Sequence, residues 1–139
     1  MKITDIEAFQ VSWAAGDKPQ QRSAFVRIHG DNGLSGIGEA SPMQGGIASL
    51  GIIARDIAPG LIGKDPLDHA VLLDTLFHTF AKLGPEGALS GALAALDIAL
   101  WGPQRQAVRS ADPQASRRYL AHHPAVLRLD RRQWRAQCR

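Results

Sequence analysis

The residue types that do chemistry in enzymes are scattered along this sequence. Ser90 has no histidine or aspartate at a spacing typical of a nucleophile with its base. His69 and His78 are nine residues apart and do not share a helix face, so we expect solvated or capping side chains rather than ligands. Cys138 is the single cysteine, and no cysteine or histidine cluster has zinc spacing. We therefore assign no catalytic residue and no metal ligand.

A glycine-rich stretch, "GLSGIGEAS" at residues 33–41, is the one phrase that resembles a phosphate-binding loop. A dinucleotide-binding loop opens a helix directly after a strand, whereas a further loop follows this stretch. The pattern therefore favours a strand whose glycines let another backbone come close. Glu39, within this stretch, and Asp97 are expected to be structural hydrogen-bonding groups.

The charge of the chain is unevenly distributed. Of the 139 residues, 45% are hydrophobic, which is typical of a globular protein. Residues 1–102 hold 7 Lys+Arg and 11 Asp+Glu, a net charge of −4, whereas residues 103–139 hold 9 Arg and 2 Asp, a net charge of +7. So sharp a shift indicates a boundary. The N-terminus does not read as a signal peptide and no apolar run is of membrane-spanning length, so we expect a cytoplasmic protein.

Three segments have the alternating pattern of strands, at residues 2–12, 22–30 and 34–40. Asn32-Gly33 lies between the last two and predicts a tight hairpin, because both residues accept positive φ. In the first strand apolar residues fall on both parities, so both faces are expected to be partly covered. Strands followed by helices predict an α+β fold: a three-stranded antiparallel meander and a small helical bundle.

Three helices are expected after the strands, at residues 47–58, 67–82 and 86–101. The first carries an apolar stripe and ends at Pro59-Gly60, and the second begins at Pro66 with Asp65 as its N-cap. Small residues on the last helix would allow close approach to another surface. The stripes are Ile47, Leu50, Ile53 and Ile57 in the first helix; Leu72, Leu73, Leu76, Phe77 and Phe80 in the second; and Leu89, Leu93, Leu96 and Leu100 in the last.

Four phrases, in this order, resemble the N-terminal capping domain of the enolase superfamily, in its mandelate racemase/muconate lactonizing enzyme branch. They are "MKITDIEAFQV", "VRIHGDNGLSGIGEASP", "DIAPGLIGKDPLD" and "ALSGALAALDIALW". They cover residues 1–101 nearly end to end, and the last phrase is the most specific. In the family this last helix continues as D-hydrophobic-x-G-K and leads into a (β/α) barrel.

After Trp101 the resemblance stops, because residues 102–118 read "GPQRQAVRSADPQASRR". When the possible codons of residues 102–139 are read from their second base, they permit the family's missing phrases in order, among them D-L-S-G-K and R-P-I-R-K-L-L-G-G. We infer a frameshift just after Trp101. The chain is then a capping domain at residues 1–101 and an Arg-rich, non-native tail at 102–139 that we expect to be disordered.

The resemblance implies a parent enzyme that abstracts a proton α to a carboxylate, as acid-sugar dehydratases and racemases do, and holds the enediolate on Mg²⁺. Ligands and bases lie in the barrel, so the resemblance implies an inactive chain with no cofactor of its own. The capping domain contributes two substrate-specificity loops, which correspond to residues 13–21 and 41–46. Their candidate residues are Trp13, Gly16, Lys18, Gln20, Met43, Gln44 and Gly45.

Other readings remain open. The Arg-rich tail, with Tyr119 and Trp134, would make the chain a small basic nucleic-acid-binding protein, although an accidental basic tail explains the same composition. A separately encoded barrel could be the partner of the capping domain. Part of the leucine stripe of the last helix is expected to face other helices or that barrel, and in the absence of the partner an exposed patch would favour self-association. We expect no specific nucleic acid and no membrane as partner.

Overall fold

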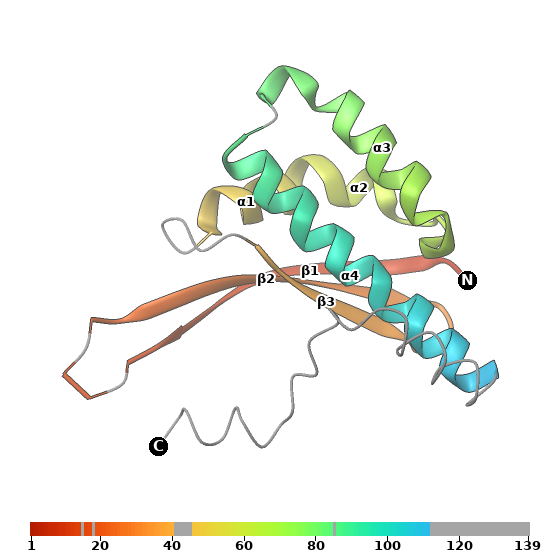
Figure 1. Ribbon diagram of the computed structural model, residues 1–139, viewed down its shortest axis with the longest axis horizontal. Helices are drawn as coiled ribbons and strands as arrows, with labels where there is room; N and C mark the ends of the chain where they lie inside the picture. The colour runs from red at the N-terminus through yellow and green to blue at the C-terminus, as the bar shows by residue number, and fades with distance from the viewer. Residues whose placement is uncertain (15, 18, 41–45, 85, 112–139) are drawn as a thin grey trace, which may run out of the picture.

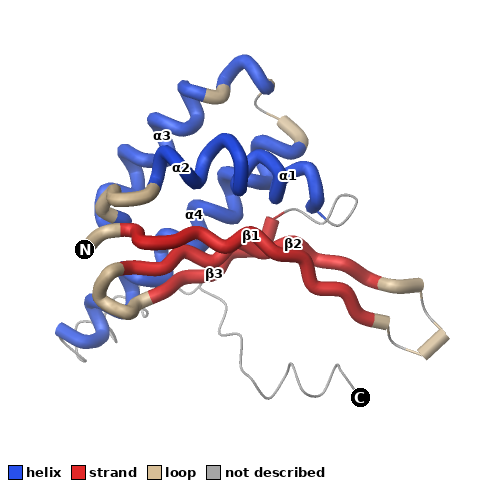
Figure 2. Tube along the Cα trace, turned by 180° about the vertical axis from the view of Figure 1, so that it is seen from behind, coloured by secondary structure: helices blue, strands red, loops and turns tan. Residues whose placement is uncertain are grey.

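The helices of the molecule lie together on one side of a three-stranded sheet (Figures 1 and 2). The computed structural model describes residues 1–14, 16–17, 19–40, 46–84 and 86–111. Strands β1 (Ile3–Trp13), β2 (Gln21–Gly30) and β3 (Ser35–Ala40) form an antiparallel meander in the order β1-β2-β3. The predicted α+β class, with a meander followed by helices, is confirmed.

A β-bulge explains the mixed parity of the first strand. The register of β1 against β2 shifts between Ile3 and Asp5. The extra residue turns the strand, so Ile3 is buried in the core together with the partly buried Ile6 and Ala8, which have the other parity. Between β2 and β3, Gly33 takes a φ of 76° and closes the predicted tight turn.

The first helical segment is not a uniform α-helix. It consists of α1 (Ile47–Gly51), a π-helical segment at Ile52–Ile57 and α2 (Ala58–Leu61). The wider π turns shift the phase of the side chains along the segment. Ile53 and Ile57 are therefore buried, but Ile47, predicted on the same stripe, is exposed. The segment also continues through Pro59-Gly60 to Leu61, because Pro59 falls in the first turn of α2, where a proline is tolerated.

The second helix begins as predicted. The Asp65 side chain accepts a hydrogen bond of 2.9 Å from the Leu67 backbone N–H and so caps a short 3₁₀ turn at Pro66–Asp68. Helix α3 (His69–Thr79) follows, then a 3₁₀ turn at Ala81–Leu83. Of the predicted stripe, Leu76 is buried, Leu72, Leu73 and Phe80 are partly buried, and Phe77 is exposed.

The last helix is longer than the sequence pattern predicts. Helix α4 spans Ala88–Ala111 and so continues ten residues beyond Trp101. Gly102 lies against the Cα atom of Gly36 in β3, and Pro103 is fully buried. These contacts hold the helix on the sheet beyond the expected end, although Pro103 has no N–H to donate to the Ala99 carbonyl.

Helix α4 lies so close to β3 that the two backbones touch. A Cβ atom at Gly36 or Gly38 would overlap the backbone carbonyl oxygens of Ala99 and Ala95, respectively. The small side chains of α4 and the glycines of β3, which have no side chain, therefore form one close contact. The prediction that the glycine-rich stretch is a strand with close backbone packing is confirmed.

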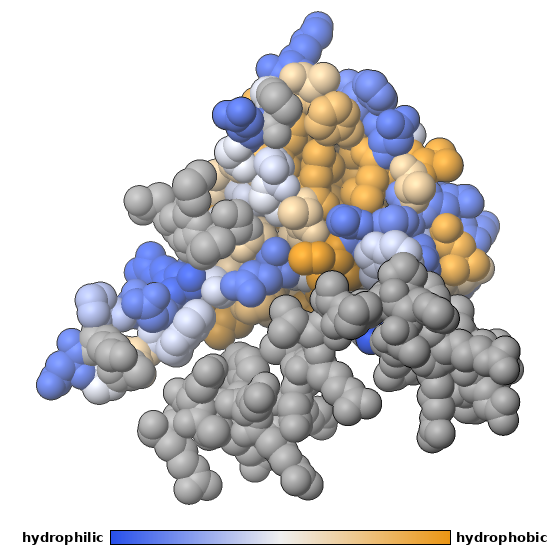
Figure 3. All heavy atoms as spheres, in the orientation of Figure 1, coloured by the Kyte–Doolittle hydropathy of each residue, from blue (hydrophilic) through white to orange (hydrophobic). Residues whose placement is uncertain are grey.

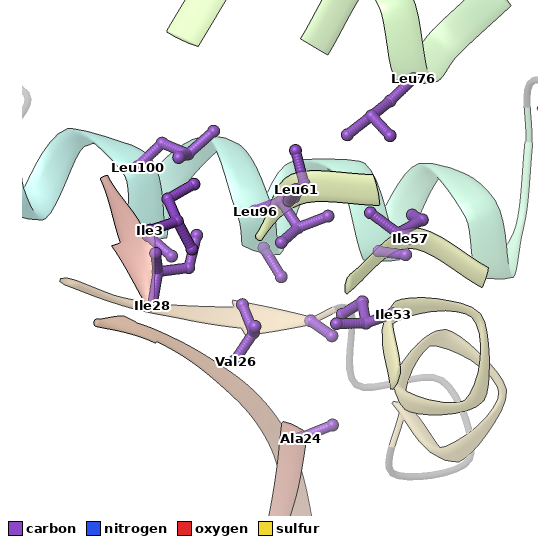
Figure 4. Packing of buried hydrophobic residues seen from close by; sticks show 14 residues of the cluster. Ile3, Ala24, Val26, Ile28, Ile53, Ile57, Leu61, Leu76, Leu96 and Leu100 are labelled. Carbon is purple, nitrogen blue, oxygen red and sulfur yellow. The ribbon is translucent and has the colours of Figure 1, made fainter. Parts of the chain in front are cut away.

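The core lies between the sheet and the helices (Figure 4). Side chains from β1 and β2 meet those from the 52–61 segment and from α4, as Ile28, Ile57 and Leu96 illustrate. Leu89, Leu96 and Leu100 are at most 2% exposed. The molecule's own sheet and helices therefore cover these three leucines, which agrees with the expectation that part of the stripe faces other helices; a contact of the stripe with a barrel stays a prediction.

Candidate functional site

Two connections begin at the same end of the sheet. In an antiparallel meander β1 and β3 run in the same direction, so the β1–β2 connection and the segment after β3 leave the sheet at the same end. At this end, β3 stops before the other two strands. Its last residue, Ala40, pairs with Ala24, whereas β1 and β2 continue to the Trp13–Gln21 pair. The hairpin therefore projects beyond the third strand, toward the left of Figure 1.

The predicted specificity residues fall on these connections where the structure describes them. Trp13 ends β1 with 44% of its surface exposed, and Gly16 takes a left-handed φ of 59° in the turn that follows. Gln20 is exposed just before β2. An exposed indole on a projecting hairpin can offer apolar contact to a ligand. The remaining candidates, Lys18, Met43, Gln44 and Gly45, lie outside the described residues, and the role of the whole set stays a prediction.

The base of the projecting hairpin is tied to β3 by a side-chain hydrogen bond. The Ser23 hydroxyl, 7% exposed as a residue, donates to Oε1 of Glu39 at 2.7 Å. On the same open face of the sheet the rings of Phe9 and Phe25 stack with centroids 5.8 Å apart. Arg27 lies over Phe9, 5.4 Å from the ring centroid. Glu39 thus has the structural hydrogen bond that was predicted for it.

A cluster of possible metal ligands, missed from the sequence, also lies on the open face. Within the described part of the chain, Asp5, Glu7 and His29 place one donor atom each within 4.8 Å of one another. Asp5 and Glu7 lie on β1, and His29 lies close to them only because β1 pairs with β2. Glu7 already contacts Arg27 at 3.3 Å and His29 at 3.4 Å, and both carboxylates are exposed. Mg²⁺ prefers oxygen ligands in octahedral geometry, which this set beside a guanidinium does not offer.

A second polar contact joins α3 to α4 on the helical side. His69 Nε2 lies 2.6 Å from Oδ1 of Asp97, and the imidazole packs against the Trp101 ring with centroids 4.7 Å apart. Nearby, the Gln104 side-chain amide donates to the Pro66 carbonyl at 2.8 Å. Asp97 therefore has the structural hydrogen bond that was predicted for it. His69, which was expected to be solvated or to cap a helix, instead has a side chain only 16% exposed and contacts Asp97. The exposed side chain of His78 lies 3.5 Å from that of Asp74, four residues earlier in α3.

Two broader expectations touch the described residues only in part. Among the helices that the structure describes, none combines the length and apolar character needed to cross a membrane. The nucleic-acid reading depends on the Arg-rich segment, and of its residues only 103–111 are described, as the end of α4.

Comparison with known proteins gives consistent matches. Residues 3–109 match the family described as mandelate racemase/muconate lactonizing enzyme, N-terminal domain. A crystal structure of a mandelate racemase/muconate lactonizing protein from Paracoccus denitrificans, complexed with magnesium, superposes with a TM-score of 0.69 and 57% identity. This match covers 77% of the present chain and 28% of the Paracoccus chain.

Two curated relatives are dehydratases by name. Cis-3-hydroxy-L-proline dehydratase of Roseibium aggregatum is 34% identical over 119 residues, which is 73% of this chain and 30% of the relative. L-talarate/galactarate dehydratase of Salmonella typhimurium is 30% identical over 86 residues, which is 60% of this chain and 22% of the relative. The chain therefore spans less than a third of the length of either relative.

Proposed function

Since the chain belongs to the mandelate racemase/muconate lactonizing enzyme family by its N-terminal domain, we propose that it is the substrate-capping part of a magnesium-dependent enzyme and is inactive alone. The reaction of that enzyme would be proton abstraction α to a carboxylate, of the dehydratase or racemase type. The observation that carries the proposal is the family match over residues 3–109. The dehydratase names of the two curated relatives support the reaction class.

The described residues fit the role of a lid and not that of a reaction centre. A cap needs surface connections on a rigid base, and the projecting hairpin, tied to β3 through Ser23 and Glu39, supplies one. A reaction centre for an enediolate needs converging oxygen ligands around a cation. The one ligand-like cluster among the described residues, Asp5, Glu7 and His29, lies on the open face of the sheet and does not suit Mg²⁺.

We propose that the catalytic part is a separate polypeptide with the remaining portion of the family fold, which binds this chain and Mg²⁺. Magnesium in the related Paracoccus structure supports the choice of cation. In such a complex Trp13 would contact substrate and help exclude water from it.

The proposal is tested by measuring turnover. The purified 139-residue chain, with MgCl₂ and a panel of hydroxy acids that includes galactarate and cis-3-hydroxy-L-proline, is expected to give no product above a no-protein control. Adding the C-terminal part of the Paracoccus relative is expected to produce magnesium-dependent turnover that chelation by EDTA abolishes. Turnover by the chain alone would overturn the assignment as a lid.

A further inference from the structure

The open face of the sheet carries a group of metal-binding side chains that the proposed function does not use. On the helical side, apolar residues gather over the helices (Figure 3). On the open face, Asp5, Glu7 and His29 bring one donor atom each within 4.8 Å of one another. The strand pairing explains this arrangement, because Asp5 lies opposite His29 in the register and Glu7, two residues along β1, has the same parity as Asp5.

One donor atom of this group is a nitrogen without a hydrogen bond. Nε2 of His29 is buried although 34% of the side chain is exposed, and it has no hydrogen-bond partner among the described residues. Buried polar atoms ordinarily have one, so this nitrogen points to a ligand independently of the carboxylates. Oε2 of Glu7 lies 3.4 Å from it. Two ligand atoms of a tetrahedral zinc ion are also about 3.4 Å apart, because each lies about 2.1 Å from the metal.

We propose that Asp5, Glu7 and His29 form a binding site for a divalent transition-metal ion of the zinc class, which joins β1 to β2. One imidazole nitrogen and two carboxylate oxygens suit Zn²⁺, whereas Mg²⁺ takes oxygen ligands in an octahedron. Three protein ligands leave the fourth tetrahedral position to water. Both carboxylates are exposed, so they are free to turn toward the ion. The site does not depend on the proposed lid function.

Arg27 competes with the ion for Glu7. Its guanidinium lies 3.3 Å from Oε2 of Glu7, and its side chain is 43% exposed. The two carboxylates and the guanidinium together carry a charge of −1 while His29 is neutral, which a divalent cation offsets. Removal of the arginine charge is therefore expected to strengthen metal binding. A purely structural role of the cluster would not produce that change.

The test is a titration of the full 139-residue chain with Zn²⁺, followed by calorimetry, and with Co²⁺, whose visible absorption reports tetrahedral coordination. His29→Gln and Asp5→Asn are expected to weaken Zn²⁺ binding at least about tenfold, because even groups that only orient a metal ligand contribute about ten- to a hundredfold in affinity. Arg27→Gln is expected to tighten binding about threefold, the usual size of an exposed charge interaction. Mg²⁺ is expected to bind at least about tenfold more weakly than Zn²⁺.

Two controls separate this site from other ligand types in the chain. His78 lies 3.5 Å from Asp74 on α3, a histidine–carboxylate pair without a second carboxylate, and His78→Gln is expected to leave Zn²⁺ binding unchanged. His122, His123 and Cys138 lie outside the described residues. The triple variant His122→Gln/His123→Gln/Cys138→Ser is expected to bind Zn²⁺ as tightly as the unsubstituted chain.

The outcomes decide the proposal. Zn²⁺ is expected to raise the melting temperature of the unsubstituted chain but not that of His29→Gln, because only a folded site binds the ion. Equal Zn²⁺ affinity of His29→Gln, Asp5→Asn and the unsubstituted chain would overturn the site. So would loss of binding in the triple variant alone, or no binding by the unsubstituted chain. Circular dichroism checks that each variant is folded, and Arg27→Gln, which removes no ligand, decides the matter if a ligand variant does not fold.

Discussion

Individual glycines decide how this domain packs. Gly36 and Gly38 stand where any side chain would overlap the backbone of α4. Their presence in the sequence, together with alanines at regular spacing in the last helix, predicted a close approach of two backbones. The partner of each glycine was not predictable, because which alanine meets which glycine depends on the angle between helix and strand. The same limit applies to the Asp97–His69 hydrogen bond, whose members are 28 residues apart.

Gly38→Ala is expected to lower the free energy of unfolding by about 1–3 kcal/mol, because the new methyl group must push α4 off the sheet. Chemical denaturation measures the effect. Gly51→Ala is the matched control: Gly51 has helical φ and no neighbouring atom where its Cβ would lie, so this substitution is expected to be stabilising by about 0.5–1 kcal/mol. Equal stability of the two variants would contradict the backbone contact.

At the scale of elements, the existence and type of strands and helices followed from periodicity and turn residues. The first and last residues of these elements were predicted less accurately, for physical reasons. The bulge after Ile3 and the π-helical turns at Ile52–Ile57 each shift the phase of the side chains, which no fixed period anticipates. Helix α4 continues past Trp101 because tertiary contacts of Gly102 and Pro103 outweigh the weak helical pattern of the following residues.

The projecting part of the β1–β2 hairpin is expected to open more easily than the rest of the sheet. Among the described residues, Val11–Trp13 and Gln21–Ser23 pair only with each other, and an isolated two-stranded ribbon is marginally stable in water. Hydrogen exchange followed by mass spectrometry is expected to give at least about tenfold faster exchange there than at Val26–Ile28, which lies in the core. Uniform protection along β2 would show that the ribbon is held by something else.

For the molecule as a whole, the described residues form an N-terminal domain of this family, and the comparisons agree with the resemblance over nearly the same residues. The family match extends to residue 109, somewhat beyond the boundary at Trp101 that composition suggested. The frameshift remains an interpretation of the sequence, because it concerns the origin of the residues and not their placement. A reading of the nucleotide sequence around codons 100–105 would decide it.

Limited proteolysis tests where the folded unit ends. With a protease of broad specificity, the smallest resistant fragment is expected to extend beyond Gln106, because Pro103 is buried and the Gln106 side chain donates to the Ser35 carbonyl at 2.7 Å. Mass spectrometry of the fragment gives its C-terminus. A resistant fragment that ends at or before residue 102 would instead place the boundary where the composition changes.

The contact between β3 and α4 also sets an order on biosynthesis. The three strands leave the ribosome first, yet the layer that shields their apolar face is completed only when Gly102 and Pro103 have been added, more than 60 residues after Ser35. Throughout that interval the nascent meander exposes its apolar face and its two edge strands. A ribosome stalled before codon 102 would therefore carry a sheet that lacks its contact with the end of the last helix.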